Sequence, residues 1–206
     1  MSRSPSTYVI IAINVLLYLY QVATGVDSAS PSTADAIAWG ANYNVTEYPY
    51  RLITSLFFHF GFIHLALNMW ALYVFGTVAE QIYGTRFFIC LYFICGIFGN
   101  LVSSTDIVSA GASGAIMGLG GVLTTVAFLK PQMGLNKKGL VGIMLLNLMI
   151  GVLTPQINNM AHIGGFMMGA LMAYTHHKYT QTMSILVGIV LCFVLLEVKE
   201  FNFSRF

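Results

Sequence analysis

Charged residues are scarce in this chain. Lysine, arginine, aspartate and glutamate together make up 8% of the 206 residues, whereas about 25% is usual for a soluble domain. The formal net charge is only +2 and the basic residues do not cluster, which excludes binding of nucleic acid through a basic patch. Hydrophobic residues account for 57%, and the mean hydropathy is +0.79. The composition therefore predicts an integral membrane protein whose surroundings are a lipid bilayer.

Cysteines and metal-ligand motifs are equally sparse. The three cysteines, Cys90, Cys95 and Cys192, all lie inside apolar runs, without the spacing of metal ligands and without partners in loops. We therefore expect buried thiols and no disulfide framework. The His-Glu-x-x-His pattern is missing, which excludes the zinc proteases that carry it. Neither a metal ion nor a cofactor is expected.

Long apolar segments, in contrast, recur along the whole chain. A helix needs about 20 residues to cross hydrocarbon, and the alternating pattern of barrel strands is absent. Because unpaired backbone groups are costly in lipid, helices are the spanning structure that fits. Together the segments predict an all-α, polytopic transmembrane helical bundle. Seven segments qualify: 8–24, 61–79, 87–105, 112–129, 139–153, 161–175 and 183–198.

The first six segments and the seventh are expected to form two parts. Residues 1–178 would make a six-helix core with a long first loop at about 25–60. Residues 179–206 would form a C-terminal extension that contains the seventh helix. The first segment could also be interpreted as a cleaved signal peptide, because Arg3 precedes it and small residues follow it. We favour a spanning helix, since the polar stretch that follows is a natural start for the long loop.

Lysine and arginine predict the orientation in the membrane. With a cytoplasmic N-terminus, six of the nine basic side chains fall inside, as the positive-inside rule requires. The six are Arg3, Arg86, Lys130, Lys137, Lys138 and Lys178, whereas Arg51, Lys199 and Arg205 fall outside. The second, fourth and sixth helices then begin at the outer face. A chain this compact suggests a bacterial host, and hence the inner (plasma) membrane.

Four polar residues lie near the outer ends of these three helices. Ser113 begins the fourth helix, His162 begins the sixth, and His64 and Asn68 lie one turn apart in the second. Ser113 needs a base to take its proton, and His162 could serve. Because no Asp or Glu lies near His162 in the sequence, a dyad is expected rather than a triad. His64, Asn68 and the backbone amide of Ser113 could stabilise the oxyanion of a tetrahedral intermediate.

Each of these features also has a purely structural interpretation. The glycine-rich runs in the fourth and sixth segments could serve only close helix packing, of which the interval from Gly165 to Gly169 is typical. A histidine at a helix start is often only interfacial or hydrogen-bonded. His64 and Asn68 could form a structural hydrogen bond between helices. The combination at one expected depth favours a shared site.

Three motifs occur in order along the second, fourth and sixth segments. They are His59-x4-His64-x3-Asn68, Gly111-x-Ser113-Gly114 and Ala161-His162-x-Gly164-Gly165-x3-Gly169. In order and spacing they resemble the rhomboid intramembrane serine proteases. The resemblance covers residues from about Tyr8 to Lys178 and includes the turn from Glu80 to Arg86.

The resemblance implies a serine endopeptidase that cuts transmembrane protein substrates without a metal or cofactor. Ser113 would be the nucleophile and His162 the general base. The oxyanion hole would comprise His64, Asn68 and the Ser113 amide, and Gly111 would shape the turn that exposes it. The first loop would be partly embedded in the membrane, and the helix at about 139–153 would flank the path of the substrate.

Three further positions are interpreted through the resemblance. His59 would be a supporting polar residue near the mouth of the cavity. Tyr50-Arg51 stands where rhomboids often carry Trp-Arg, and an interfacial aromatic keeps the anchoring role. Met117 stands where the family often has an aromatic residue that packs on the histidine, and a thioether can also pack on an imidazole ring.

Polar residues near the outer ends of several segments predict a water-filled pocket. They are Ser55, His59, Asn68, Ser103, Ser104, Thr105, Asn158 and Asn159, of which the last two could equally be ordinary helix caps. Two other functions compete with a protease. An inactive rhomboid-like escort of membrane proteins would typically lack the serine or the histidine, and both are present. A small transporter would be expected to carry an intramembrane acidic pair or an inverted repeat, and the sequence shows neither.

Overall fold

Helices make up most of the part of the chain described by the computed structural model, which is residues 4–103, 107–153 and 158–203. Each of the seven predicted apolar segments corresponds to a long helix, so the prediction of an all-α transmembrane bundle is confirmed. These helices are α1 (Pro5–Ala23), α4 (Phe62–Tyr83), α5 (Thr85–Val102), α6 (Ser113–Leu129), α7 (Lys137–Leu153), α8 (Asn159–Lys178) and α9 (Gln181–Phe203). Most begin or end a few residues beyond the apolar segments.

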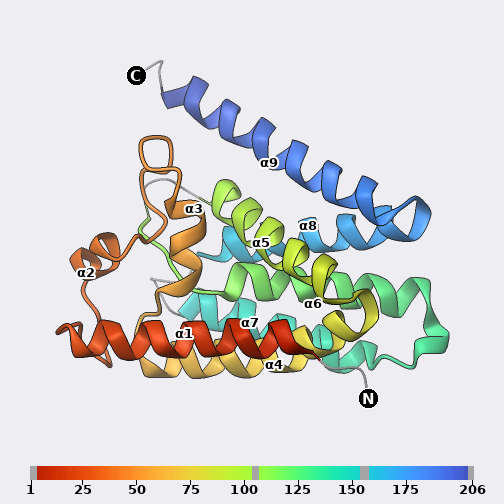
Figure 1. The fold of residues 1–206 in the computed structure, drawn as a ribbon, viewed down its shortest axis with the longest axis horizontal. Coiled ribbons are helices and arrows are strands. Elements are labelled where there is room, and N and C mark those ends of the chain that lie inside the picture. Colours follow the sequence, from red (N-terminus) through yellow and green to blue (C-terminus); the bar gives the residue numbers. More distant parts are fainter. Residues whose placement is uncertain (1–3, 104–106, 154–157, 204–206) are drawn as a thin grey trace.

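The helices run roughly side by side, with α6 and α8 in the middle of the bundle (Figure 1). In that view α1 and α4 lie below this central pair and α9 lies along the upper edge. By length and composition α1, α4, α5 and α9 can each cross a membrane, and α6 is apolar but shorter. The central helices bury more of their surface against protein, so they depend less on contact with lipid.

Glycines set the close approach of α6 and α8. A Cβ at Gly165 would overlap the carbonyl of Gly114, and one at Gly169 would overlap the carbonyl of Gly118. A Cβ at Gly121 of α6 would in turn overlap the carbonyl of Phe166 in α8. The two backbones therefore touch along several turns, as the small-residue pattern predicted. Any side chain at these positions would push the helices apart.

A buried carboxylate joins α1, α4 and α5. Glu80, in the last turn of α4, is 2% exposed. It accepts hydrogen bonds from the backbone N–H groups of Ser6 and Thr7, and from the hydroxyls of Thr7 and Thr85. The two amides belong to the first turn of α1, where backbone donors lack partners within the helix and a negative charge is favourable. Gly84, with φ +78°, makes the tight turn into α5.

The first loop contains short helices of its own at the end of the bundle where α4, α6 and α8 begin. These are α2 (Thr33–Ala38), α3 (Arg51–Thr54) and the 3-10 turn η1 (Ser55–Phe57). A capping box between Ser32 and Asp35 starts α2. The guanidinium of Arg51 donates to the carbonyl of Tyr43 at 2.9 Å, so this residue braces the loop. A second 3-10 turn, η2 (Pro131–Met133), lies at the opposite end of the bundle.

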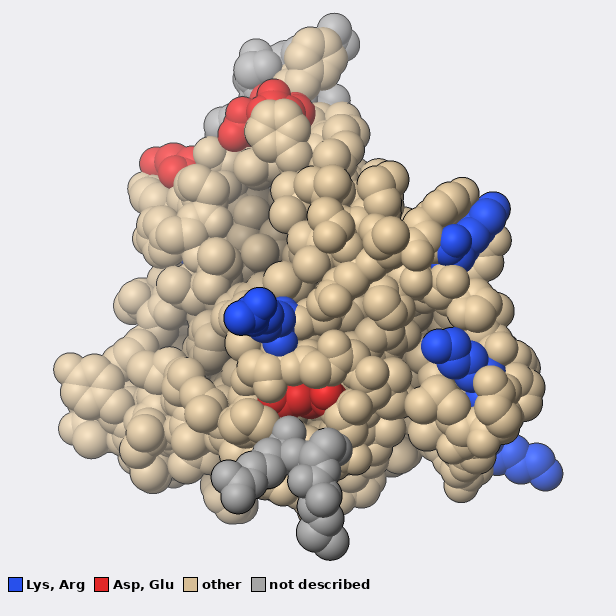
Figure 2. Space-filling model, turned by 45° about the vertical axis from the view of Figure 1, so that its right-hand side comes forward, with Lys and Arg blue, Asp and Glu red and all other residues tan. Residues whose placement is uncertain are grey.

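Charged side chains are few on the surface. Figure 2 shows most of the basic groups on the right of the visible face and most of the acidic groups at its top, while a basic and an acidic group lie near each other lower on the face and broad areas are uncharged. Many large apolar side chains of α1, α4, α7 and α9 are exposed; among the most exposed are Leu16, Phe62, Ile63, Val152 and Phe193. This distribution suits a protein whose sides face hydrocarbon and whose ends face water.

Candidate active site

Ser113 and His162 meet at one end of the α6–α8 contact. Ser113 is the first residue of α6 and His162 lies in the first turn of α8. The Ser113 Oγ and the His162 Nε2 are 2.7 Å apart, within hydrogen-bonding distance. His162 is 2% exposed, and within the described residues its Nδ1 has no hydrogen-bond partner. The pair therefore has the geometry of a nucleophile beside its base, without a carboxylate to orient the imidazole.

His64 is oriented by the backbone of the segment that precedes it. The N–H of Phe60 donates to the His64 Nδ1 at 3.2 Å. An accepting Nδ1 places the proton of the neutral ring on Nε2. That Nε2 has no partner among the residues that the structure describes, although it is buried. His64 therefore presents an unused N–H donor.

Gly111 fits the space beside His64 only because it lacks a side chain. Its φ is +126°, a conformation that residues with a Cβ rarely adopt. A Cβ at this position would lie 2.8 Å from the His64 Cε1 and 3.0 Å from its Nε2. The N–H of Gly111 donates to the carbonyl of Ser55 at 2.8 Å. Gly111 thus brings the start of α6 against the free nitrogen of His64.

Asn68 and His59 both lie next to His64: Asn68 is hydrogen-bonded to its backbone, and the ring of His59 lies beside its ring. The Asn68 Nδ2 donates to the carbonyl of His64, one turn back in α4, at 2.8 Å. An amide group carries two N–H donors, so one remains beyond this bond. The His59 ring lies 5.2 Å from the ring of His64 and is fully buried. Neither nitrogen of His59 has a partner in the described part of the chain.

A buried polar network supports this end of the bundle. The Asn100 Nδ2 donates to the carbonyl of Leu52 and to the hydroxyl of Ser55, and the Asn42 Nδ2 donates to the hydroxyl of Ser103. Ser55 and Ser103, which the sequence assigned to a water-filled pocket, are therefore members of a buried hydrogen-bonded cluster. Sequence reasoning missed Asn42 and Asn100. Asn100 could have been found, because it is a polar amide inside an apolar segment and such a group needs a hydrogen-bond partner.

The other predicted pocket residues have different positions. Asn158 caps α8, since its side chain accepts from the N–H of Met160, and Asn159 is the first residue of that helix. The cap interpretation fits Asn158. Ser104 and Thr105 lie outside the described residues. Among the residues that are described, no group of three or more His, Cys, Asp or Glu side chains could hold a metal ion.

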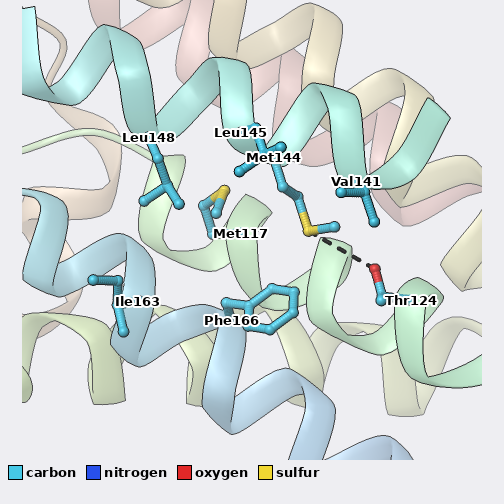
Figure 3. Close-up of a pocket in the computed structure, with 8 residues that line it drawn as sticks. All are labelled: Met117, Thr124, Val141, Met144, Leu145, Leu148, Ile163 and Phe166. Atoms are coloured by element: carbon cyan, nitrogen blue, oxygen red, sulfur yellow. Dashed lines mark hydrogen bonds between the residues drawn. The ribbon is translucent and has the colours of Figure 1, made fainter. Parts of the chain in front are cut away.

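An apolar cavity lies next to the dyad, between α6, α7 and α8. Its volume is about 210 Å³. Met117, one turn after Ser113, and Ile163, next to His162, line it together with residues of α7 (Figure 3). The hydroxyl of Thr124 in its wall donates to the sulfur of Met144. The remaining lining residues are Val141, Leu145, Leu148 and Phe166.

Comparisons with known proteins identify relatives of this chain. Residues 46–179 match the Rhomboid domain. The rhomboid protease GluP of Bacillus subtilis (strain 168) is 36% identical over 171 residues, which cover 79% of this chain and 33% of GluP. RHOMBOID-like protein 5 of Arabidopsis thaliana is 39% identical over 134 residues, covering 61% of this chain and 43% of the relative. The putative rhomboid protease YdcA of Bacillus subtilis is 34% identical over 131 residues, covering 61% and 66%.

The length of the matched regions shows to which family the chain belongs and how much of each relative it covers. The matched region spans from one third to two thirds of the length of these three relatives. The match to the Rhomboid domain, residues 46–179, includes every residue of the three motifs, from His59 to Gly169. The domain covers more than half of the chain, and the chain therefore belongs to the rhomboid family.

Proposed function

We propose that this protein is an intramembrane serine endopeptidase that uses Ser113 and His162 as a catalytic dyad. The observation that carries the proposal is the 2.7 Å distance between the Ser113 Oγ and the His162 Nε2. In the first step Oγ attacks the carbonyl carbon of the scissile peptide bond, and Nε2 takes the hydroxyl proton. The same proton then passes to the leaving amine, which leaves an acyl group on Ser113. A water molecule, activated by His162, hydrolyses this ester and restores the serine.

Three donors can stabilise the oxyanion that forms during both steps. They are the backbone N–H of Ser113, the Nε2–H of His64 and the second N–H of Asn68. The Ser113 amide lies at a helix N-terminus, where backbone donors lack partners within the helix. The unused Nε2 of His64 is buried, and a hydrogen bond to a charge is stronger in a site that excludes water. Gly111 keeps the space next to this nitrogen open.

The substrates would be membrane proteins with a transmembrane segment. The peptide bonds of a stable helix are shielded and their carbonyls already hydrogen-bonded, so the segment must unwind locally before Ser113 can attack. Small or helix-breaking residues near the cut would help. The substrate would approach past α7, the helix whose inner side lines the apolar cavity. With a cytoplasmic N-terminus in the plasma membrane, the dyad would open to the outer side.

Two parts of the chain would have separate tasks. Residues 1–178 would form the catalytic core, and residues 179–206 would add α9 as a further spanning helix. All the residues proposed to act in chemistry lie in the first part. The length and hydropathy of α9 are sufficient for it to cross the membrane.

The experiment that tests the proposed function is covalent labelling with a fluorophosphonate probe. The purified wild-type protein in detergent should be labelled, and the Ser113→Ala and His162→Ala variants should not. Cleavage of a single-pass substrate in proteoliposomes should disappear in the same two variants. His177→Ala is the matched control, because His177 is an exposed histidine at the far end of the same helix. A folded wild-type protein that neither reacts with the probe nor cleaves would instead support the inactive escort.

A further inference from the structure

The connection between α5 and α6 leads directly to Ser113 and is anchored at several points. In its described residues, Ser109 forms an antiparallel bridge with Asn42, with N–H to carbonyl distances of 2.8 and 3.3 Å. Gly111 donates to the carbonyl of Ser55 at 2.8 Å. Both partners belong to the first loop. The position of the nucleophile therefore depends on how firmly this connection is held.

The start of the connection is held by α9. The Lys199 Nζ donates to the carbonyl of Ser103 at 2.8 Å. Ser103 directly follows α5, and its own N–H closes the last turn of that helix on the carbonyl of Gly99. A cation is favourable at this place, because the carbonyl end of a helix carries partial negative charge. Lys199 thus caps α5 from another helix.

Ser103 also belongs to the buried network that holds the other anchors. Its hydroxyl donates to the carbonyl of Asn100 at 2.7 Å and accepts from the Asn42 Nδ2 at 2.8 Å. The Asn100 Nδ2 donates to the hydroxyl of Ser55 at 2.8 Å. Asn42 and Ser55 are the same residues that hold Ser109 and Gly111. A continuous set of hydrogen bonds therefore links Lys199 to the residues that precede the nucleophile.

Apolar contacts hold this part of α9 against the first loop and the end of α5. Leu195 and Leu196, about one turn before Lys199, pack against a cluster of Val45, Leu52 and Leu101. Val45 and Leu52 belong to the first loop, and Leu101 lies in the last turn of α5. These contacts fix the backbone of α9 but supply no polar partner to the carbonyl of Ser103. The ammonium group of Lys199 supplies it.

We propose that Lys199 is a positioning residue for catalysis, which fixes the connection between α5 and α6 through the carbonyl of Ser103. By this connection it holds Gly111 against His64 and Ser113 against His162. The proposal rests on the proposed function for its chemical consequence. It gives α9 a task in the active site, although α9 lies outside the six helices of the core.

The test compares variants of the full-length protein in detergent and in proteoliposomes. Lys199→Met removes the charge and the donor while keeping an unbranched side chain, and Lys199→Arg keeps both. Lys199→Gln, which keeps a neutral donor, serves if the methionine variant folds poorly. Glu200→Gln is the matched control, because Glu200 is the next residue of α9 and is exposed. Each variant is measured for kcat and KM on a single-pass substrate, for the rate of fluorophosphonate labelling and for Tm.

We expect Lys199→Met to lower kcat and the labelling rate about three- to tenfold. This is less than the full effect of losing a hydrogen bond to a charged group, because only part of that effect would reach Ser113. KM should stay within error, and Lys199→Arg and Glu200→Gln should match the wild type. Wild-type rates in Lys199→Met, or equal losses in the methionine and arginine variants, would overturn the proposal. So would a loss of activity that follows Tm alone, because that would indicate a merely structural contact.

A second measurement does not need an active enzyme. Hydrogen exchange of the peptide that covers residues 107–116 should be faster in Lys199→Met than in the wild type and unchanged in Lys199→Arg. If the wild type is not labelled by the probe, the proposed function fails, and this exchange still decides whether Lys199 holds the connection. Unchanged exchange in Lys199→Met would contradict that role.

Discussion

Gly165 of α8 lies so close to Gly114 of α6 that a Cβ on Gly165 would overlap the carbonyl of Gly114. Gly114 directly follows Ser113, and Gly165 lies three residues after His162. One of the tightest contacts between α6 and α8 therefore lies beside the proposed dyad. Helix packing and the geometry of the proposed dyad depend on neighbouring residues, so a change in the packing should alter the distance between Ser113 and His162.

The variant Gly165→Ala tests this dependence. The added methyl must separate α6 and α8, at a cost of about 1–3 kcal/mol in stability for an overpacked site. The Oγ to Nε2 distance should then lengthen, and labelling by a fluorophosphonate should fall by a larger factor than the fraction of folded protein. Gly142→Ala is the control, because a Cβ at Gly142 meets nothing within 4 Å. Normal labelling in Gly165→Ala would show that the helices can part without moving the dyad.

The variant Gly111→Ala should lower kcat through its contact with His64. The alanine must accept a φ of +126° and would press on the His64 ring. Displacing one oxyanion donor lowers kcat by about 100-fold or more, and KM should change little. Gly25→Ala places the same strain, at φ +101°, where a Cβ meets nothing within 4 Å. Equal kinetic losses in both variants would mean that strain, rather than the contact with His64, is responsible.

His64 and Asn68 should contribute unequally to the oxyanion hole. His64→Ala removes a donor that has no other partner in the described structure, so we expect kcat to fall by about 100-fold or more. Asn68→Ala removes a side chain that already bonds to the carbonyl of His64, and about a tenfold loss is expected, within the range for one hydrogen bond. Steady-state kinetics on one substrate measures both. A larger loss for Asn68→Ala would reverse this order.

Glu80 should matter for stability rather than for chemistry. Glu80→Ala leaves two backbone donors of α1 and two hydroxyls without their buried acceptor, and the loss should be about 3 kcal/mol or more. Thermal unfolding in detergent should show a clearly lower Tm, while kcat of the folded fraction at low temperature stays close to that of the wild type. Glu200→Gln, on the exposed side of α9, should leave Tm unchanged. An unchanged Tm for Glu80→Ala would refute this assignment.

Much of the fold could be predicted from the sequence, because the signals are local. Apolar runs of sufficient length marked all seven long helices, and the glycine spacing indicated a close contact between α6 and α8. The placement of Ser113 and His162 at helix starts on one side followed from counting the segments. The bounds were less certain: the segment expected to end at residue 105 is helical only to Val102, and the buried Ser103 that follows accepts a hydrogen bond from Asn42 of the first loop.

The sequence by itself determined that the chain lies in a membrane as a helical bundle and which residues carry its motifs. Composition and spacing are properties of short stretches, and they decide whether burial in lipid is favourable. Only the tertiary structure decided which groups bond to each other: the Phe60 N–H with the His64 Nδ1, the Asn42 side chain with Ser103, and Lys199 with the carbonyl of Ser103. Asn42 and Ser103 are separated by 61 positions in the sequence, and Ser103 and Lys199 by 96 positions. Hydrogen bonds are made over about 3 Å, and only the packing of the helices sets distances that short between remote segments.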